Sequence, residues 1–247
     1  MVDYLYDGTF EGFLCCIYAH YYEEKANGIF HREHYQANLI GHAREVATDE
    51  SKAVKVYEAI ENKISPYDMQ RVYRVFLSSI ENKETKLLKY IVFGFKHGSK
   101  IRLLHGEPVV VDVQQIEQKV TCEVHRLLGL IRFTTLKGDI LYSPIEPDHD
   151  ICEFLAKHFC DRFKNDPFII HDKKRSKALI ASGGDWYIST FTSEDLPELA
   201  EDENDYRKLW KKYFDTIAIK ERINPKCQKN FMPVRYWKNL TEKMQYE

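Results

Sequence analysis

The sequence has 247 residues, of which 44% are hydrophobic and 30% are charged, and its 36 basic and 38 acidic side chains give a formal net charge of −2. This composition excludes an intrinsically disordered chain, and the balanced charge gives no global signature of nucleic-acid binding. We expect a cytoplasmic globular protein, because no apolar run is long enough to cross a membrane and the N-terminus lacks a secretory signal.

The first predicted region, residues 1–128, is mainly helical. A short strand is expected at 3–6, then a helix from about Gly8 with Asp7 as its N-cap, and then irregular structure over 27–46. Start signals and apolar spacing predict further helices at about 48–63, with Thr48 as the N-cap, from Ser65-Pro66 onward, at about 83–96 and at about 108–128.

The second region, residues 129–192, changes to the period of strands. Alternating side chains around Lys137-Gly138 predict a hairpin over 130–143. A helix at about 149–163 and three short strands, at 168–171, 178–181 and 185–190, follow. We therefore predict a small antiparallel sheet in the order β-β-α-β-β-β, with a helix on one face, and an α+β fold class for the whole chain.

The last region contains an acidic segment and then a basic one. Residues 193–204 hold six acids and are expected to form a solvated linker. Residues 203–247 are predicted to be basic helices that pack on the body. Between 205 and 247 there are eleven Lys or Arg against five Asp or Glu, so positive charge is concentrated locally.

Several short strings stand out along the chain. They are Tyr6-Asp7-Gly8-Thr9-Phe10-Glu11-Gly12-Phe13-Leu14, His125-Arg126-x-x-Gly129-x-x-Arg132-Phe133, Glu146-Pro147-Asp148-His149-Asp150, Phe159-x-x-Arg162-Phe163, Ile170-His171-Asp172-Lys173-Lys174-Arg175, Trp210-x-x-Tyr213, Asn224-Pro225 and Met232-Pro233-x-Arg235-Tyr236-Trp237-x-Asn239-Leu240-x-Glu242. Together they resemble a bacterial family of DNA-metabolism and DNA-repair proteins built on a domain of unknown function. The resemblance covers nearly the whole chain.

The resemblance implies a DNA-related process and a partner, a radical SAM protein of DNA modification or repair. In other relatives the domain resembles a fusion partner of a uracil-DNA glycosylase domain; we expect no such domain in this sequence, so base excision is not assigned to it. The resemblance transfers no catalytic residues, and we predict neither a cofactor nor a metal. The radical SAM motif C-x-x-x-C-x-x-C is absent, so that chemistry would belong to the partner.

One group of side chains has the composition of a catalytic or metal site. Its members are Asp148, His149, Asp150, His171 and Asp172. Imidazole and carboxylate groups bind transition metals and can activate water in a hydrolase. The alternative is purely structural, because acids at a helix start cap its N–H groups and the last pair ends a strand.

A second group has the composition of a nucleic-acid interface. Cations and aromatic rings together bind phosphates and stack on bases. The alternatives are a solvated turn at 173–177, and aromatic side chains that pack the C-terminal helices onto the body. The candidates are Arg132, Arg162, Lys173, Lys174, Arg175, Lys177, Arg235, Tyr236 and Lys238.

Asp7-Gly8-Thr9 forms a third candidate, for anion binding, because it lies between a predicted strand and a helix N-terminus. The alternative is an ordinary capped helix with a glycine in a tight turn. No Walker A or dinucleotide-binding motif accompanies it.

Three hypotheses follow for the function. The first is an accessory protein that binds DNA, single-stranded or duplex, and works with the radical SAM partner. The second is a metal-assisted enzyme acting on DNA, centred on the Asp148-His149-Asp150 string and His171. The third is a structural adaptor for the partner without DNA contact. Whether the chain is an enzyme stays open, and no membrane partner is expected.

Overall fold

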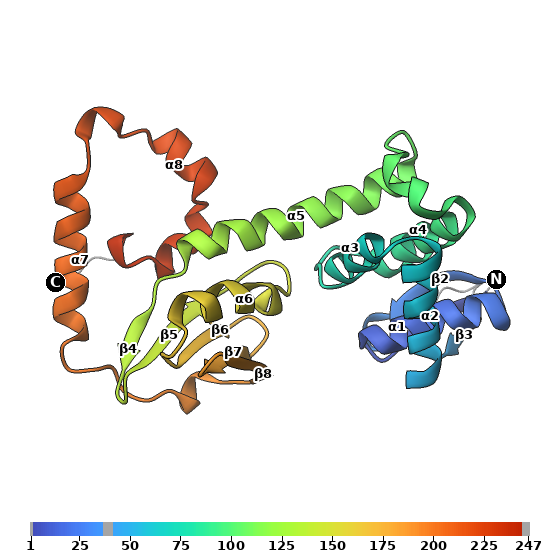
Figure 1. Ribbon diagram of the computed structural model, residues 1–247, viewed down its shortest axis with the longest axis horizontal. Helices are drawn as coiled ribbons and strands as arrows, with labels where there is room; N and C mark the ends of the chain where they lie inside the picture. Colours follow the sequence, from blue (N-terminus) through green and yellow to red (C-terminus); the bar gives the residue numbers. More distant parts are fainter. Residues whose placement is uncertain (1, 37–41, 244–247) are drawn as a thin grey trace. The chain divides into compact units, whose positions relative to one another are not determined.

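The computed structural model describes residues 2–36 and 42–243, apart from the side chains of Asp195 and Lys220. The chain forms two compact units, Met1–Thr121 and Cys122–Glu247, each with its own sheet and helices. Figure 1 shows the elements of both units. Within the described ranges, no helix is long and apolar enough to cross a membrane.

The first unit combines a three-stranded sheet with helices. The strands pair in the order β2-β1-β3, and both pairs are parallel. The elements in chain order are β1 (Val2–Tyr6), α1 (Phe10–Tyr22), β2 (Ala26–His31), η1 (Arg32–His34), β3 (His42–Glu45), α2 (Glu50–Lys63), α3 (Pro66–Phe76), α4 (Lys83–His97), η2 (Gly98–Leu103) and α5 (Pro108–Leu130), which continues into the second unit.

The expectation of irregular structure over 27–46 is wrong, because β2 and β3 lie there. Both are outer strands of a three-stranded sheet, and β3 is His-Ala-Arg-Glu, with largely exposed side chains. Such a strand is held by its backbone ladder to β1 and shows no alternation of apolar and polar residues. Residues 37–41 of the same segment lie outside the described residues.

Two helix caps differ from the predicted ones. Thr9, rather than Asp7, caps α1, and its Oγ1 accepts the N–H of Gly12 at 3.0 Å. Asp49 caps α2, where Thr48 was expected. Asp7 and Thr48 instead bond to each other, because Thr48 Oγ1 donates to Asp7 Oδ2 at 2.7 Å. The two residues that were predicted as caps, Asp7 and Thr48, thus link the start of α1 to the start of α2.

The start of α3 agrees with its sequence signal. Pro66 occupies the first turn, and Ser65 Oγ accepts the N–H of Asp68 at 3.1 Å. Behind this turn lies a buried ionic network. Arg71 donates from Nε to Glu117 at 2.7 Å and from Nη1 to Tyr90 at 2.9 Å and to Asp68 at 3.1 Å. The network joins α3 and α4 to the first half of α5.

The second unit contains a five-stranded sheet in the order β4-β5-β6-β7-β8. Helix α6 packs against β6, β7 and β8 and covers one face of the sheet (Figure 1). The elements are β4 (Thr134–Leu136), β5 (Ile140–Ile145), α6 (Cys152–Phe163), β6 (Phe168–Asp172), β7 (Lys177–Ser182), β8 (Asp185–Thr190), η3 (Ser193–Asp195), α7 (Glu203–Ile217), η4 (Lys220–Arg222), α8 (Pro225–Phe231), η5 (Val234–Asn239) and η6 (Thr241–Lys243).

The α+β class and the order β-β-α-β-β-β are confirmed. The sheet is not antiparallel throughout, however, because β5 and β6 run parallel. These two strands are joined through α6, and a helical crossover returns the chain in its original direction. The other three ladders are antiparallel, as expected.

The acidic segment 193–204 is more than the predicted solvated linker. Its backbone pairs with β4: the N–H of Lys137 donates to the carbonyl of Glu198 at 2.8 Å, and that of Ala200 to Thr135 at 3.0 Å. Leu199 forms an isolated bridge with Leu136. The segment therefore covers the outer edge of the sheet with its backbone. Glu194, Glu198, Glu201 and Asp202 are exposed, whereas Glu203 is buried and accepts the backbone N–H of Thr135 at 2.8 Å.

Candidate functional site

Glu123 on α5 is the centre of a buried polar cluster. Its side chain is 3% exposed and accepts the backbone N–H groups of Asp148 at 2.9 Å and His149 at 2.8 Å. From the C-terminal segment, the hydroxyl of Tyr236 donates to it at 2.6 Å and Nη2 of Arg235 at 3.2 Å. One carboxylate thus fixes both the loop before α6 and the string Arg235-Tyr236.

The electrostatics of this cluster favour a charged Glu123 and a neutral His149. Burial raises the pKa of Glu123, but hydrogen bonds from Tyr236 and from the backbone of Asp148 and His149 outweigh it, so the pKa is below its ordinary value. Burial lowers the pKa of His149, against the opposing effect of the Glu123 and Asp148 carboxylates. Burial also raises the pKa of the Tyr236 phenol.

The basic turn after β6 is fastened to the same loop. Arg175 donates from Nη2 to the carbonyl of Asp148 at 2.6 Å, and from Nη1 to the carbonyl of Pro147 at 3.3 Å and to Asp172 Oδ2 at 2.9 Å. Asp172 is fully buried and also accepts the N–H of Lys174. These contacts make Arg175 and Asp172 structural parts of the turn.

Most of the predicted phosphate-binding cations are ion-paired. Arg132 forms a two-point pair with Glu242, at 2.8 and 3.2 Å. Opposite charges this close neutralise each other, so these side chains attract phosphate less than free cations would. The further pairs are Lys174–Asp148 at 3.8 Å, Lys177–Asp150, Arg235–Asp148 at 2.5 Å and Lys238–Glu146 at 2.6 Å.

His171 has different neighbours from those of His149. It is buried, its Nδ1 is 3.0 Å from the hydroxyl of Tyr142, and its ring packs edge-on against Phe191. Within residues 2–36 and 42–243, no group of three or more His, Cys, Asp or Glu side chains is arranged to hold a metal ion. The acidic and imidazole candidates therefore do not converge on one metal centre.

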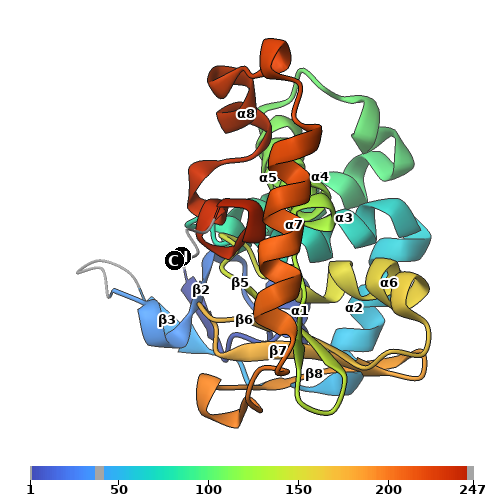
Figure 2. The same ribbon diagram turned by 90° about the vertical axis from the view of Figure 1, so that its left-hand side faces the viewer.

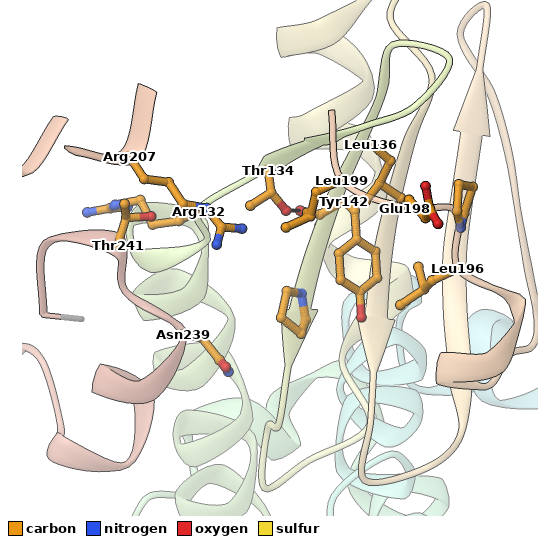
Figure 3. A pocket seen from close by; sticks show the side chains of 12 residues that line it. Arg132, Thr134, Leu136, Tyr142, Leu196, Glu198, Leu199, Arg207, Asn239 and Thr241 are labelled. Carbon is orange, nitrogen blue, oxygen red and sulfur yellow. Dashed lines mark hydrogen bonds between the residues drawn. The ribbon is translucent and has the colours of Figure 1, made fainter. Parts of the chain in front are cut away.

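A pocket of about 340 Å³ opens beside strands β4 and β5 (Figure 3). In Figure 3, Arg132, Arg207 and Thr241 lie on one side of it, and Tyr142 and Leu196 lie on the other. The side chains that line it come from both strands, the acidic segment, α7 and the C-terminal turns. They are Arg132, Thr134, Leu136, Tyr142, Pro144, Leu196, Pro197, Glu198, Leu199, Arg207, Asn239 and Thr241.

Residues 203–231, which contain α7, η4 and α8, are called the arm below. Figure 2 shows α7 on the side of the second unit that faces the viewer. Its apolar side chains recur at helical spacing yet remain exposed, with Tyr206 and Leu209 both at 62%. A soluble helix normally buries such a stripe, so this face is open to a ligand or partner. The exposed large side chains of the arm are Tyr206, Leu209, Trp210, Tyr213, Ile217, Ile219, Ile223 and Phe231.

The arm also carries cations without acidic partners. Arg207 pairs with Glu203, and Lys208 lies 3.8 Å from Asp205. Among the side chains that the structure describes, five further cations of the arm form no ion pair with any acid. They are Lys211, Lys212, Arg222, Lys226 and Lys229.

A family model described as a domain of unknown function, DUF4130, matches residues 81–242. The chain belongs to the DUF4130 family. The matched region contains the Glu123 cluster, the pocket and the arm, whereas Asp7-Gly8-Thr9 lies outside it. The family description confirms a domain of unknown function and gives no biochemical role.

The other comparisons add little to this membership. None of the curated proteins matches the chain significantly. Among solved structures, the chain is similar to one titled as the pGpG-specific phosphodiesterase PggH from Vibrio cholerae, with 8% identity, 88% of this chain and 100% of that chain covered, and a TM-score of 0.36. A likeness at that score carries no argument about fold or function.

Outside the DUF4130 region, Asp7, Gly8 and Thr9 form a compact turn. Asp7 Oδ1 accepts the N–H of Thr9 at 3.0 Å and its hydroxyl at 2.6 Å, and Gly8 has a φ of +90°. Burial raises the pKa of Asp7, but these hydrogen bonds and that from Thr48 outweigh it and lower the pKa. These contacts explain Asp7-Gly8-Thr9 as the turn before α1, in which Thr9 caps the helix and the ionised carboxylate of Asp7 holds Thr9 in place.

Two features of the region that the DUF4130 model matches were not predicted from the sequence, namely Glu123 and the pair Leu196 and Leu199. Glu123 is a lone acid between Val120 and Leu127, which lie on the same buried helical face, and that position is the signal of a buried functional or structural carboxylate. Leu196 and Leu199 interrupt the acidic segment, and these two apolar side chains mark the part of it that packs on the sheet.

Proposed function

We propose that this protein is an accessory protein of DNA metabolism that binds nucleic acid through its arm. The observation that supports the proposal is the coincidence, on one segment, of unpaired cations with exposed aromatic rings. Lys212 and Lys229 are exposed without an acidic partner, and Tyr206, Tyr213 and Phe231 are exposed beside them in the sequence. This is the combination with which single strands are held.

Single-stranded nucleic acid is the favoured ligand. Aromatic side chains stack on unpaired bases, and each stacked base contributes about 1–3 kcal/mol. In a duplex the bases stack on each other, and only the phosphates would be available to the arm. The chain has a net charge of −2 overall, so we expect binding of modest affinity with a strong dependence on salt.

The cations predicted from the sequence take different parts in this proposal. Lys173 and Arg162 are exposed and form no ion pair in the described part of the chain, so they can extend a phosphate track beyond the arm. Arg132 and Arg175 serve the fold through their carboxylate and carbonyl contacts. Tyr236 is buried against Glu123 and does not serve as a stacking surface.

The test is fluorescence anisotropy with labelled single-stranded and duplex DNA over a salt series. The variant Lys212→Ala/Lys229→Ala is expected to weaken single-strand binding and to reduce the salt slope by about 0.7 for each lost phosphate contact. Tyr213→Ala is expected to weaken single-strand binding more than duplex binding. The matched control is Lys55→Ala/Lys89→Ala, which removes the same charge from exposed helix positions of the first unit.

Binding that is unchanged in both arm variants would contradict the proposal, as would an absence of binding at low salt. Equal losses in the arm variant and in the Lys55→Ala/Lys89→Ala control would show only a response to net charge.

A second candidate function is an adaptor that docks a protein partner on the arm. The exposed aliphatic side chains Leu209, Ile217 and Ile223 favour it, because aliphatic groups suit a protein surface better than a base stack. The family resemblance suggests a radical SAM protein as that partner. If the arm is an adaptor surface, Leu209→Glu should abolish co-purification with the partner and leave the affinity for DNA unchanged. If the arm binds nucleic acid, Lys212→Ala/Lys229→Ala should lower the affinity for DNA more than Leu209→Glu does.

A further inference from the structure

We infer that the pocket beside β4 and β5 takes a single unstacked nucleobase together with its phosphate. The ligand class is a nucleoside monophosphate, either free or as one unit of a bound strand. This inference rests on the proposed function in one respect: the strand on the arm would supply the nucleotide. The pocket itself stands on its own geometry.

The size and the walls of the pocket suit a flat heteroaromatic ring. Its volume of about 340 Å³ lies in the range of small-ligand sites. One wall is apolar and is formed by Leu136, Tyr142, Leu196 and Leu199. A nucleobase has two apolar faces, and either face can be buried favourably against such a wall. A hydrated sugar or an inorganic ion has no such apolar face.

Asn239 gives the pocket a means of reading the edge of a base. It lines the pocket from η5, and its carboxamide makes no hydrogen bond to another described residue. The amide therefore offers two N–H donors and a carbonyl acceptor, the groups with which Asn and Gln pair with base edges. An amide beside an apolar wall favours a planar ligand with both donors and acceptors.

Arg207 gives the opposite side of the pocket a phosphate contact. Its Nε donates to Glu203 at 2.8 Å, while the four N–H groups of Nη1 and Nη2 form no hydrogen bond within the described residues. Arg132 differs, because its Nη1 donates to the carbonyls of Gly129 and Ile131, and its Nε and Nη2 donate to Glu242. Arg207 therefore offers the free donors for the phosphate.

The local charge decides which part of the ligand dominates binding. Arg132 and Arg207 are each paired with a glutamate, so this side of the pocket is close to neutral. A phosphate ion alone gains little there, and the base has to supply most of the affinity. Arg207 lies on α7, so a strand on the arm passes beside the pocket opening.

The experiment measures binding of the four 2′-deoxynucleoside 5′-monophosphates to the full chain by titration calorimetry, with inorganic phosphate as a second probe. We expect nucleotide binding that is about tenfold weaker in Leu199→Glu, which puts a carboxylate at the apolar wall, and in Asn239→Leu, which removes the amide. Phosphate alone should bind much more weakly. Asn165→Leu, at an exposed turn after α6, is the matched control and should bind like the parent.

A single strand containing one 2-aminopurine then separates the two sources of the nucleotide. If the base enters from a strand, 2-aminopurine fluorescence changes on binding, and Asn239→Leu removes that change while strand affinity at the arm persists. Strand binding without any mononucleotide binding overturns the pocket and leaves the proposed function intact.

Mononucleotide binding without strand binding has the opposite meaning: the pocket stands as a free-nucleotide site and the proposed function fails. Unchanged nucleotide affinity in Asn239→Leu, or phosphate binding as strong as nucleotide binding, overturns the inference. Near-ultraviolet circular dichroism checks that each variant is folded. If Leu199→Glu does not fold, the affinity of Asn239→Leu for nucleotides decides whether the inference holds. Binding of an apolar peptide in place of nucleotides also overturns it.

Discussion

Arg235 and Glu123 are 112 residues apart in the sequence, yet Arg235 Nη2 lies 3.2 Å from Glu123 Oε1. The same guanidinium reaches Asp148 through Nη1 at 2.5 Å. Glu123 is buried, whereas the side chain of Arg235 is 45% exposed. The pair therefore joins the C-terminal segment to α5 from the outside, with the buried hydroxyl of Tyr236 completing the contact from within.

Glu123→Gln is expected to loosen this junction. The amide retains one oxygen, but the negative charge and part of the acceptor capacity for the N–H groups of Asp148 and His149 are lost. An unsatisfied buried donor costs about 1–3 kcal/mol, so the denaturant midpoint should fall. Hydrogen exchange should accelerate at 234–242. Glu201→Gln, at an exposed position, is the control, and equal midpoints in the two variants would contradict the assignment.

The stability of the second unit should depend on His149 in mild acid. Burial lowers the pKa of His149 in the folded state, below the ordinary value of 6.5. The unfolded chain therefore binds its proton first as pH falls, and this contribution to stability is present above about pH 6.5 and declines below it. In the variant His149→Gln, the thermal midpoint should depend less on pH between about pH 6.5 and 5 than it does in the parent.

For this pH dependence, His158→Gln provides the reference, since His158 is exposed on α6. An equal slope in parent and His149→Gln would show that other groups cause the acid sensitivity. Glu123 adds a slope of the same sign at lower pH, because its pKa is also lowered, from an ordinary value of 4.5.

In the first unit, Arg71→Ala is expected to be strongly destabilising. The guanidinium is buried between Asp68 and Glu117, and its removal leaves two buried carboxylates without their cation. Loss of one partner of such a pair costs about 3–5 kcal/mol. Urea unfolding should show it, with the exposed Arg102→Ala as reference; a loss below about 1 kcal/mol would refute the network as a stabilising element.

Gly8→Ala tests the turn before α1. The φ of +90° disfavours any L side chain, and an added Cβ would lie 2.3 Å from Nε2 of His31. We expect a loss of about 1–3 kcal/mol in the free energy of unfolding. Gly106→Ala is the matched control, because an added Cβ there meets no atom within 4 Å. A Gly8 variant as stable as the Gly106 variant would exclude this strain.

Local signals in the sequence predicted the elements that depend on local physics. The Ser65-Pro66 start, the hairpin around Gly138 and the strands after α6 are correct because caps, turns and alternation act within a few residues. The strands β2 and β3 were not predictable in this way. Their pairing with β1 is parallel and distant in the sequence, and exposed side chains give β3 no periodic pattern.

The candidate site was predictable in composition but not in geometry. The strings around Asp148, Arg175 and Arg235 do meet, but as partners of one another and of Glu123. A sequence shows that cations are present, whereas only the fold shows which carboxylate each one faces. For the same reason the pocket could not be anticipated, since Leu199 and Arg207 reach it from segments that looked like linker and helix surface.

The Glu123 cluster also has a consequence for the order in which the protein is made. A ribosome adds about 5–20 residues per second, so Arg235 emerges on the order of ten seconds after Glu123. During that interval the first unit has all of its residues, while the carboxylate of Glu123 stays hydrated and the end of α5 lacks its cover. A chain stalled before residue 235 would therefore display an unfinished second unit, which proteases recognise, beside a finished first one.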